Sequence, residues 1–202
     1  IGATVEAAAG RVPICVGTTH AGTDACAFLS RRAQQLGAAA VMVAPPRLAR
    51  PTDAALRRHY LTVAAAVDLP VVVQDHPTSS GVPMTVEFLA RLGEEAPSCR
   101  FVKLEDEPTP PKLTQLLTAN PKLRIYGGLG ASMFDEELRR GAIGIMTGFG
   151  FPEVASAVGR SEAACRQLAV RARRHMEAGR PRFEADRRER EEDRHDQLRH
   201  RL

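Results

Sequence analysis

Short runs of apolar residues alternate with longer amphipathic segments from the start of the chain to about residue 148. The runs are unbroken and lack the regular alternation of apolar and polar residues that marks a half-exposed strand. Unbroken runs are typical of strands that are covered on both faces of a parallel sheet. The predicted strands span residues 12–19, 38–44, 70–77, 101–104, 123–128 and 142–148.

Amphipathic segments that begin at capping residues separate these runs. Apolar positions recur at helical spacing after Thr23 or Asp24, and Gly37 supplies a stop for this helix. The predicted helices span residues 4–9, 23–36, 52–67, 85–92, 110–117 and 133–139. The chain therefore contains about six strand–helix units, which suit either an open doubly wound sheet or a (β/α)8 barrel.

Small or polar residues stand at the end of almost every predicted strand. They are Thr18, Thr19, Gln74, Asp75, His76, Lys103, Glu105, Gly127, Gly128, Thr147 and Gly148. A site assembled from the ends of several strands is typical of a barrel. No GxGxxG sequence follows the first strand, which disfavours a dinucleotide-binding fold. We therefore predict a (β/α)8 TIM barrel.

Composition and charge limit the class of protein. The 202 residues are 44% hydrophobic, enough for one domain with a sizeable core or most of a larger one. The net charge of +4 alone would suggest nucleic acid as a partner, but acids nearly balance arginines in the charged stretch 186–193. No interleaving of aromatic and basic residues supports such a site either. We expect no nucleic-acid partner.

The cysteines and the hydropathy indicate the cellular setting. Cys15, Cys26, Cys99 and Cys165 form no CxxC pair, so we interpret them as buried thiols in a reducing compartment. No run is long and apolar enough to span a membrane, and no leader precedes the first strand. We expect a cytoplasmic protein with no membrane partner.

Lys103 is the most informative residue, because it lies in an apolar strand near the strand's carboxyl end. Ammonium groups rarely occupy such positions, since they lose hydration there. An apolar setting favours the neutral amine, which attacks ketones to form Schiff bases. The alternative is a lysine that reaches from the strand end to pair with Glu105 or Asp106.

Four segments at their observed separations resemble the dihydrodipicolinate synthase / N-acetylneuraminate lyase family. They are residues 17–19, 71–81, 101–103 and 141–146. The resemblance implies a (β/α)8 barrel with a C-terminal helical bundle, usually in a homotetramer. It implies that residues 1–152 are a partial barrel that lacks its first two strands, and that residues 153–202 are a helical region with a charged tail. We expect sequence upstream of Ile1.

The resemblance also implies a chemistry. Lys103 matches the family's lysine that forms an imine with pyruvate or another 2-keto acid. Gln74 stands where the family has a proton-relay tyrosine, so Asp75 or His76 would act as acid or base, or the chemistry is altered or lost. The alternative for His76 is a histidine that only supports neighbouring groups through hydrogen bonds. Ser79 stands near the place of an arginine that binds a dicarboxylic aldehyde. The pattern looks more like the branch that dehydrates 2-keto-3-deoxy sugar acids.

Other candidates follow from position. Glu105 lies two residues beyond Lys103 and hence on the same strand face, where it could bind a hydroxyl or move a proton, or pair with a cation. The resemblance also makes Gln74, Ser79 and Met146 substrate-binding candidates, with a core role as the alternative for Met146. Thr18, Thr19, Gly127 and Gly128 are candidates by their place at strand ends. The alternative for the threonines is a solvated loop, and for the glycines it is steric necessity.

Two functions of different class remain. The first is a Schiff-base lyase, an aldolase or dehydratase, that needs neither metal nor nucleotide cofactor because the imine supplies the electron sink. The second is a non-catalytic barrel relative with a binding or assembly role, which the loss of tyrosine at Gln74 would permit.

Overall fold

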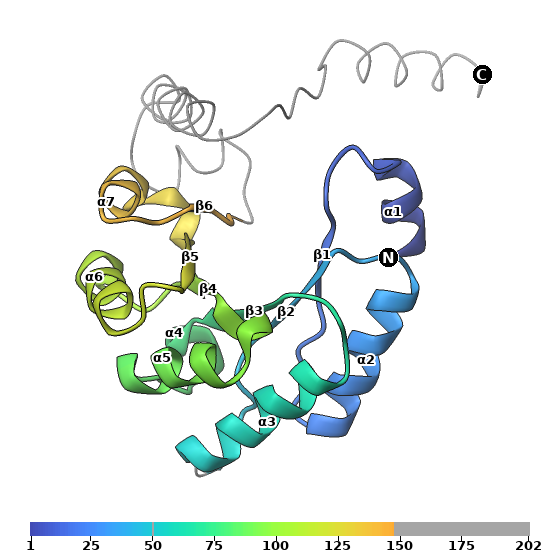
Figure 1. Cartoon of the computed structure of the whole chain (residues 1–202), viewed down its shortest axis with the longest axis horizontal. Helices are drawn as coiled ribbons and strands as arrows, with labels where there is room; N and C mark the ends of the chain where they lie inside the picture. Colours follow the sequence, from blue (N-terminus) through green and yellow to red (C-terminus); the bar gives the residue numbers. More distant parts are fainter. Residues whose placement is uncertain (50, 148–202) are drawn as a thin grey trace.

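The computed structural model describes residues 1–49 and 51–147, and in this part the strands form one parallel sheet (Figure 1). The strands are hydrogen-bonded in the order in which they occur in the sequence. They are β1 (Cys15–Gly17), β2 (Ala40–Val43), β3 (Val71–Asp75), β4 (Phe101–Leu104), β5 (Arg124–Gly127) and β6 (Gly144–Ile145). A doubly wound sheet reverses its strand order at a switch point. The described part shows no such reversal, so the doubly wound alternative is wrong there.

Helices connect successive strands and lie in an arc along one side of the sheet (Figure 1). The connecting helices are α2 (Thr23–Gln35), α3 (Asp53–Ala65), α4 (Pro77–Ser80), α5 (Val86–Glu95), η1 (Pro97–Arg100), α6 (Thr109–Ala119), η2 (Leu129–Ala131) and α7 (Phe134–Arg139), and α1 (Gly2–Ala8) precedes β1. The short turns α4, η1 and η2 were not predicted from the sequence. Each is too short for a hydrophobic periodicity to reveal it.

Capping residues begin α3 and α5 as predicted, but the predicted cap at Thr23 or Asp24 is wrong, because α2 has Gly22 at its N-cap and no side-chain cap. The hydroxyl oxygens of Thr52 and Thr85 accept hydrogen bonds from the backbone N–H groups at the starts of α3 and α5. Gly37 has φ +88, a left-handed conformation that glycine adopts without strain. These local signals explain why the helix positions were predictable from the sequence.

The two faces of the sheet differ in burial. The face toward the helices is fully buried and consists of Val41, Val43, Val71, Val73, Val102, Leu104 and Ile125. On the opposite face, Val72 is buried, Met42, Lys103 and Tyr126 are half-buried, and Arg124 is exposed. The predicted cover on both faces is therefore only partly present in the described residues. The face that carries Lys103 would be the interior of a closed barrel, and the six described strands form only an arc.

Three further expectations have separate outcomes. Cys26 and Cys99 are buried, but Cys15 is exposed on the edge strand β1, so the prediction of a buried thiol is wrong there. None of the helices in residues 1–49 and 51–147 has the length and apolarity of a membrane span. Cys165, Gly148 and the predicted helical region 153–202 lie outside the described residues.

Candidate active site

Lys103 and Glu105 form an ion pair where β4 ends. The Lys103 Nζ atom lies 3.0 Å from Glu105 Oε1, and the two side chains are 12% and 9% exposed. Glu105 follows β4 directly, and its backbone N–H donates to the carbonyl of Asp75 on the neighbouring strand. The two-residue spacing places both side chains on the same face, as predicted. The ion-pair alternative for both residues is therefore present in the structure.

Gln74 completes the cluster. Its Nε2 atom donates to Glu105 Oε2 over 2.7 Å, and Gln74 and Lys103 are register partners in the pairing of β3 with β4. One carboxylate oxygen thus contacts an ammonium and the other accepts from an amide. Such a carboxylate is held in one orientation and can exchange a proton with the lysine. The structure brings together Gln74, Lys103 and Glu105, and we refer to them below as the Lys103 cluster.

The glycine pair after β5 makes room for carboxylates. A Cβ atom on Gly128 would lie 2.3 Å from Glu105 Cγ, and a Cβ atom on Gly127 would lie 1.9 Å from Glu137 Oε2. The steric explanation that the sequence left open is therefore present at both positions. Leu129 follows with φ 45, a strained value for a side chain of its size. This bend directs its backbone N–H toward Glu105 Oε1, at 3.5 Å.

Asp75 lies away from the Lys103 cluster. It is completely buried on the helix side of the sheet, with Oδ2 2.7 Å from the Lys112 ammonium on α6. Burial raises its pKa, and the positive charge of the adjacent Lys112 ammonium opposes that rise. Neighbouring residues of a strand point to opposite faces. The expectation that Asp75 exchanges protons at the Lys103 amine does not agree with this geometry.

Several predicted positions line a cleft of about 390 Å³ at the ends of β1, β2 and β3. Its lining comprises Thr19, His20, Ala21, Ala44, Pro45, Pro46, Arg47, Gln74, His76, Ser79 and Ser80. Gln74 belongs to both the cleft and the Lys103 cluster, so the two are contiguous. The lining contains a cationic arginine and two histidines but no carboxylate, and the Arg47 guanidinium donates to the carbonyl of Ser79.

Thr18 and Met146 have structural contacts. Thr18 is buried, and its hydroxyl forms a 2.9 Å hydrogen bond with Ser30 on α2, away from the cleft. The substrate-binding expectation for Thr18 does not agree with that orientation. Met146 follows β6, and its backbone N–H donates to the carbonyl of Gly127 over 2.9 Å. Its side chain is half-buried.

Sequence reasoning missed Arg47 and Lys112. Arg47 follows two prolines after β2. A cation close to a strand end is a signal that could have identified it, because barrel sites are built at strand ends. Lys112 lies in α6, where a lysine is usually solvated. Nothing in the local sequence indicated that its side chain would be only 12% exposed.

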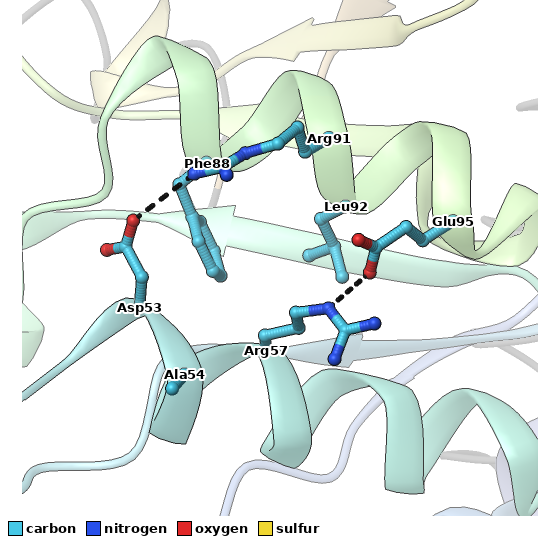
Figure 2. Close-up of a pocket in the computed structure, with 7 residues that line it drawn as sticks. All are labelled: Asp53, Ala54, Arg57, Phe88, Arg91, Leu92 and Glu95. Atoms are coloured by element: carbon cyan, nitrogen blue, oxygen red, sulfur yellow. Dashed lines mark hydrogen bonds and ion pairs between the residues drawn. The ribbon is translucent and has the colours of Figure 1, made fainter.

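A second hollow lies between α3 and α5, on the helix side of the sheet (Figure 2). Phe88 and Leu92 form its apolar part, and two ion pairs cross it, Arg57 with Glu95 and Arg91 with Asp53. These charges are neutralised by each other. Within the described residues, no group of three or more His, Cys, Asp or Glu side chains is arranged to hold a metal ion.

Comparisons with known proteins agree with this architecture. The model of the dihydrodipicolinate synthetase family matches residues 1–150. An L-2-keto-3-deoxyarabonate dehydratase from Azospirillum brasilense is 38% identical over 154 residues, which are 74% of this chain and 50% of that protein. A 4-hydroxy-tetrahydrodipicolinate synthase from Acidobacterium capsulatum is 37% identical over 153 residues, which are 75% of this chain and 48% of that protein.

A solved structure shows the same fold. The 4-hydroxy-tetrahydrodipicolinate synthase of Methylacidiphilum fumariolicum SolV superposes with a TM-score of 0.73 at 25% identity, over 87% of this chain and 55% of that one. This chain spans about half the length of the curated relatives that it matches. The sequential parallel sheet is accordingly part of a TIM-barrel fold, and the chain belongs to the dihydrodipicolinate synthetase family.

Proposed function

We propose that this chain carries the Schiff-base site of a lyase that acts on a 2-keto acid, with Lys103 as the nucleophile. The observation that carries the proposal is the contact between the Lys103 ammonium and Glu105, whose second oxygen is held by Gln74. This arrangement supplies an amine and a proton acceptor side by side, at the strand ends where barrel enzymes build their sites.

The geometry suits imine formation. Glu105 Oε1, 3.0 Å from Nζ, can take a proton from the ammonium and free the amine for attack. The new bond joins Nζ to the keto carbon, and the keto oxygen leaves as water after protonation. The resulting protonated imine accepts the electron pair that is released when a proton leaves the adjacent carbon. The hydroxyl on the next carbon can then depart with a proton, so that the net change is loss of water.

The cleft beside Gln74 supports a hydroxylated substrate. Arg47, His20 and His76 offer hydrogen-bond donors, and the lining has no carboxylate to repel an acid. The similarity to an L-2-keto-3-deoxyarabonate dehydratase points to the same class. We therefore propose dehydration of a 2-keto-3-deoxy sugar acid as the reaction. Assembly into a homotetramer and a cytoplasmic setting stay predictions.

Borohydride trapping with pyruvate tests the nucleophile. The full gene product that contains this chain is incubated with pyruvate and reduced, and the adduct is located by intact mass and peptide mapping. We expect one adduct, on Lys103, that is absent from Lys103→Met and retained in Lys122→Met, which removes an exposed lysine. A folded protein that stays unmodified would contradict the lyase proposal and favour a non-catalytic relative.

The same assay, followed over time, tests Glu105. Glu105→Gln keeps the shape of the side chain but removes the proton acceptor, so we expect adduct formation to slow by about 10²- to 10⁴-fold. Glu107→Gln, which changes an exposed neighbour, is the matched control. An unchanged rate in Glu105→Gln would show that the carboxylate only orients Lys103.

A further inference from the structure

The Lys112 ammonium contacts three separate segments of the chain next to the Lys103 cluster. Its Nζ atom lies 2.7 Å from Asp75 Oδ2 on β3, 2.7 Å from Asp106 Oδ2 in the loop after β4, and 2.7 Å from the carbonyl oxygen of Met84 before α5. An ammonium has three donors. Two of the contacts, to Asp106 and to the Met84 carbonyl, are hydrogen bonds, and the contact with Asp75 is an ion pair, so all three directions around the ammonium face protein oxygens and not substrate.

These contacts are adjacent in sequence to the cluster itself. Asp75 follows Gln74, and Asp106 follows Glu105. A direct hydrogen bond of 2.8 Å from the Glu105 N–H to the Asp75 carbonyl joins the same two segments. The positions of the Gln74 and Glu105 side chains consequently depend on how firmly the ends of β3 and β4 are held together.

Burial makes the Lys112 contacts costly to lose. The Asp75 side chain is 0% exposed, Lys112 is 12% exposed and Asp106 is 30% exposed. A buried carboxylate without its cation would have to bind a proton or draw in water. Either response would disturb the end of β3, because neither carboxylate oxygen of Asp75 has a hydrogen-bond partner among the described residues and the ion pair with Lys112 is the contact that holds the side chain.

We propose that Lys112 is a positioning residue for the Lys103 cluster: it fixes the ends of β3 and β4 relative to each other and so sets the distance between Gln74, Glu105 and Lys103. This proposal rests on the proposed Schiff-base function and adds a residue that contacts none of the reacting atoms. Lys112 acts through Asp75 and Asp106 from the helix side of the sheet.

The test uses the full gene product and pyruvate as the probe. The rate of borohydride-trapped adduct formation is measured against pyruvate concentration, which gives a maximal rate and a half-saturating concentration. In Lys112→Met we expect the maximal rate to fall about tenfold or more, with the half-saturating concentration changed less than about threefold, because the catalytic groups are misplaced while the pyruvate site remains. Lys122→Met is the matched control.

A second variant separates positioning from simple charge balance. Lys112→Met combined with Asp75→Asn removes the unpaired buried carboxylate, so we expect the melting temperature to recover while the maximal rate stays low. Recovery of both in the double variant would overturn the proposal, since Lys112 would then only neutralise Asp75. A rate in Lys112→Met equal to that of the unmodified protein would overturn it as well.

Amide hydrogen exchange decides the matter independently of activity. We expect exchange at the Glu105 amide to accelerate about tenfold or more in Lys112→Met, with little change at Val41 and Val43 on β2. If the unmodified protein forms no adduct, the proposed function fails, and unchanged exchange at Glu105 would then overturn the positioning role by itself.

A further variant is used if Lys112→Met does not fold. In Asp106→Asn we expect a smaller loss of rate and faster exchange at the Glu105 amide. An unaltered rate and unaltered exchange would overturn the proposal.

Discussion

At the scale of single residues, Glu105 is the best-defined group of the candidate site. Its two carboxylate oxygens contact Lys103 and Gln74, and its side chain lies over Gly128. Glu105 can therefore occupy its position only because residue 128 is a glycine and has no side chain. This geometry links a backbone position after β5 to the orientation of a side chain after β4.

Gly128→Ala should displace Glu105. The new Cβ atom would lie 2.3 Å from Glu105 Cγ, and overpacking of this kind costs about 1–3 kcal/mol. We expect lower stability in urea unfolding together with slower adduct formation at Lys103. Gly17→Ala is the control, since its Cβ atom would meet no atom within 4 Å. Equal effects of the two substitutions would contradict the steric role of Gly128.

At the scale of elements, α3 and α5 pack through two kinds of contact (Figure 2). Phe88 on α5 is 4% exposed, and its ring lies 6.5 Å from that of Tyr60 on α3. The ion pair of Arg57 with Glu95 lies at the surface, where the two side chains are 54% and 37% exposed. Water and salt screen such a pair, whereas the apolar contact is protected from both.

The two contacts should therefore differ in their contribution to stability. Glu95→Gln should lower the free energy of unfolding by about 0.2–1 kcal/mol, and this loss should vanish in concentrated salt. Phe88→Ala should lower it by about 3–5 kcal/mol at any salt concentration. Urea unfolding at low and high sodium chloride measures both. If Glu95→Gln lowers the free energy of unfolding by the same amount at low and high salt, the expectation that salt screens this surface ion pair is contradicted.

At the scale of the whole molecule, the layer between sheet and helices holds carboxyl groups as well as apolar side chains. Glu137 on α7 is 1% exposed, and its Oε1 atom accepts a hydrogen bond from the Thr109 hydroxyl. Burial raises the pKa of Glu137 from its ordinary value of 4.5, and the hydrogen bond from Thr109 opposes this rise. The folded protein therefore holds this proton more tightly than the unfolded chain does.

The sign of the pH dependence follows from the raised pKa of Glu137. The contribution to stability is complete below the unfolded-state pKa and is lost as the pH rises through the folded-state pKa. We expect the free energy of unfolding to fall above about pH 4.5, and Glu137→Gln to reduce that slope. Urea unfolding from acid to neutral pH, with exposed Glu94→Gln as the control, measures it. A slope in Glu137→Gln as steep as that of the unmodified protein would contradict the assignment.

Local sequence determined much of what this chain forms. Apolar runs, capping threonines and Gly37 predicted the six strands and the longer helices, because hydrophobic periodicity and helix caps depend on residues a few positions apart. The two-residue repeat of a strand also placed Lys103 and Glu105 on one face before any tertiary contact was known.

Tertiary structure decided the remainder. The contact of Gln74 with Glu105 spans 31 positions. The fit of Glu105 over Gly128 depends on the register of the strands. The pairing of Asp75 with Lys112 depends on how α6 packs against the sheet. The uneven burial of the two sheet faces has the same origin, since an apolar run does not specify which face the helices cover. Local sequence predicted where a lysine and a carboxylate stand; only the packing of distant segments determines what holds them there.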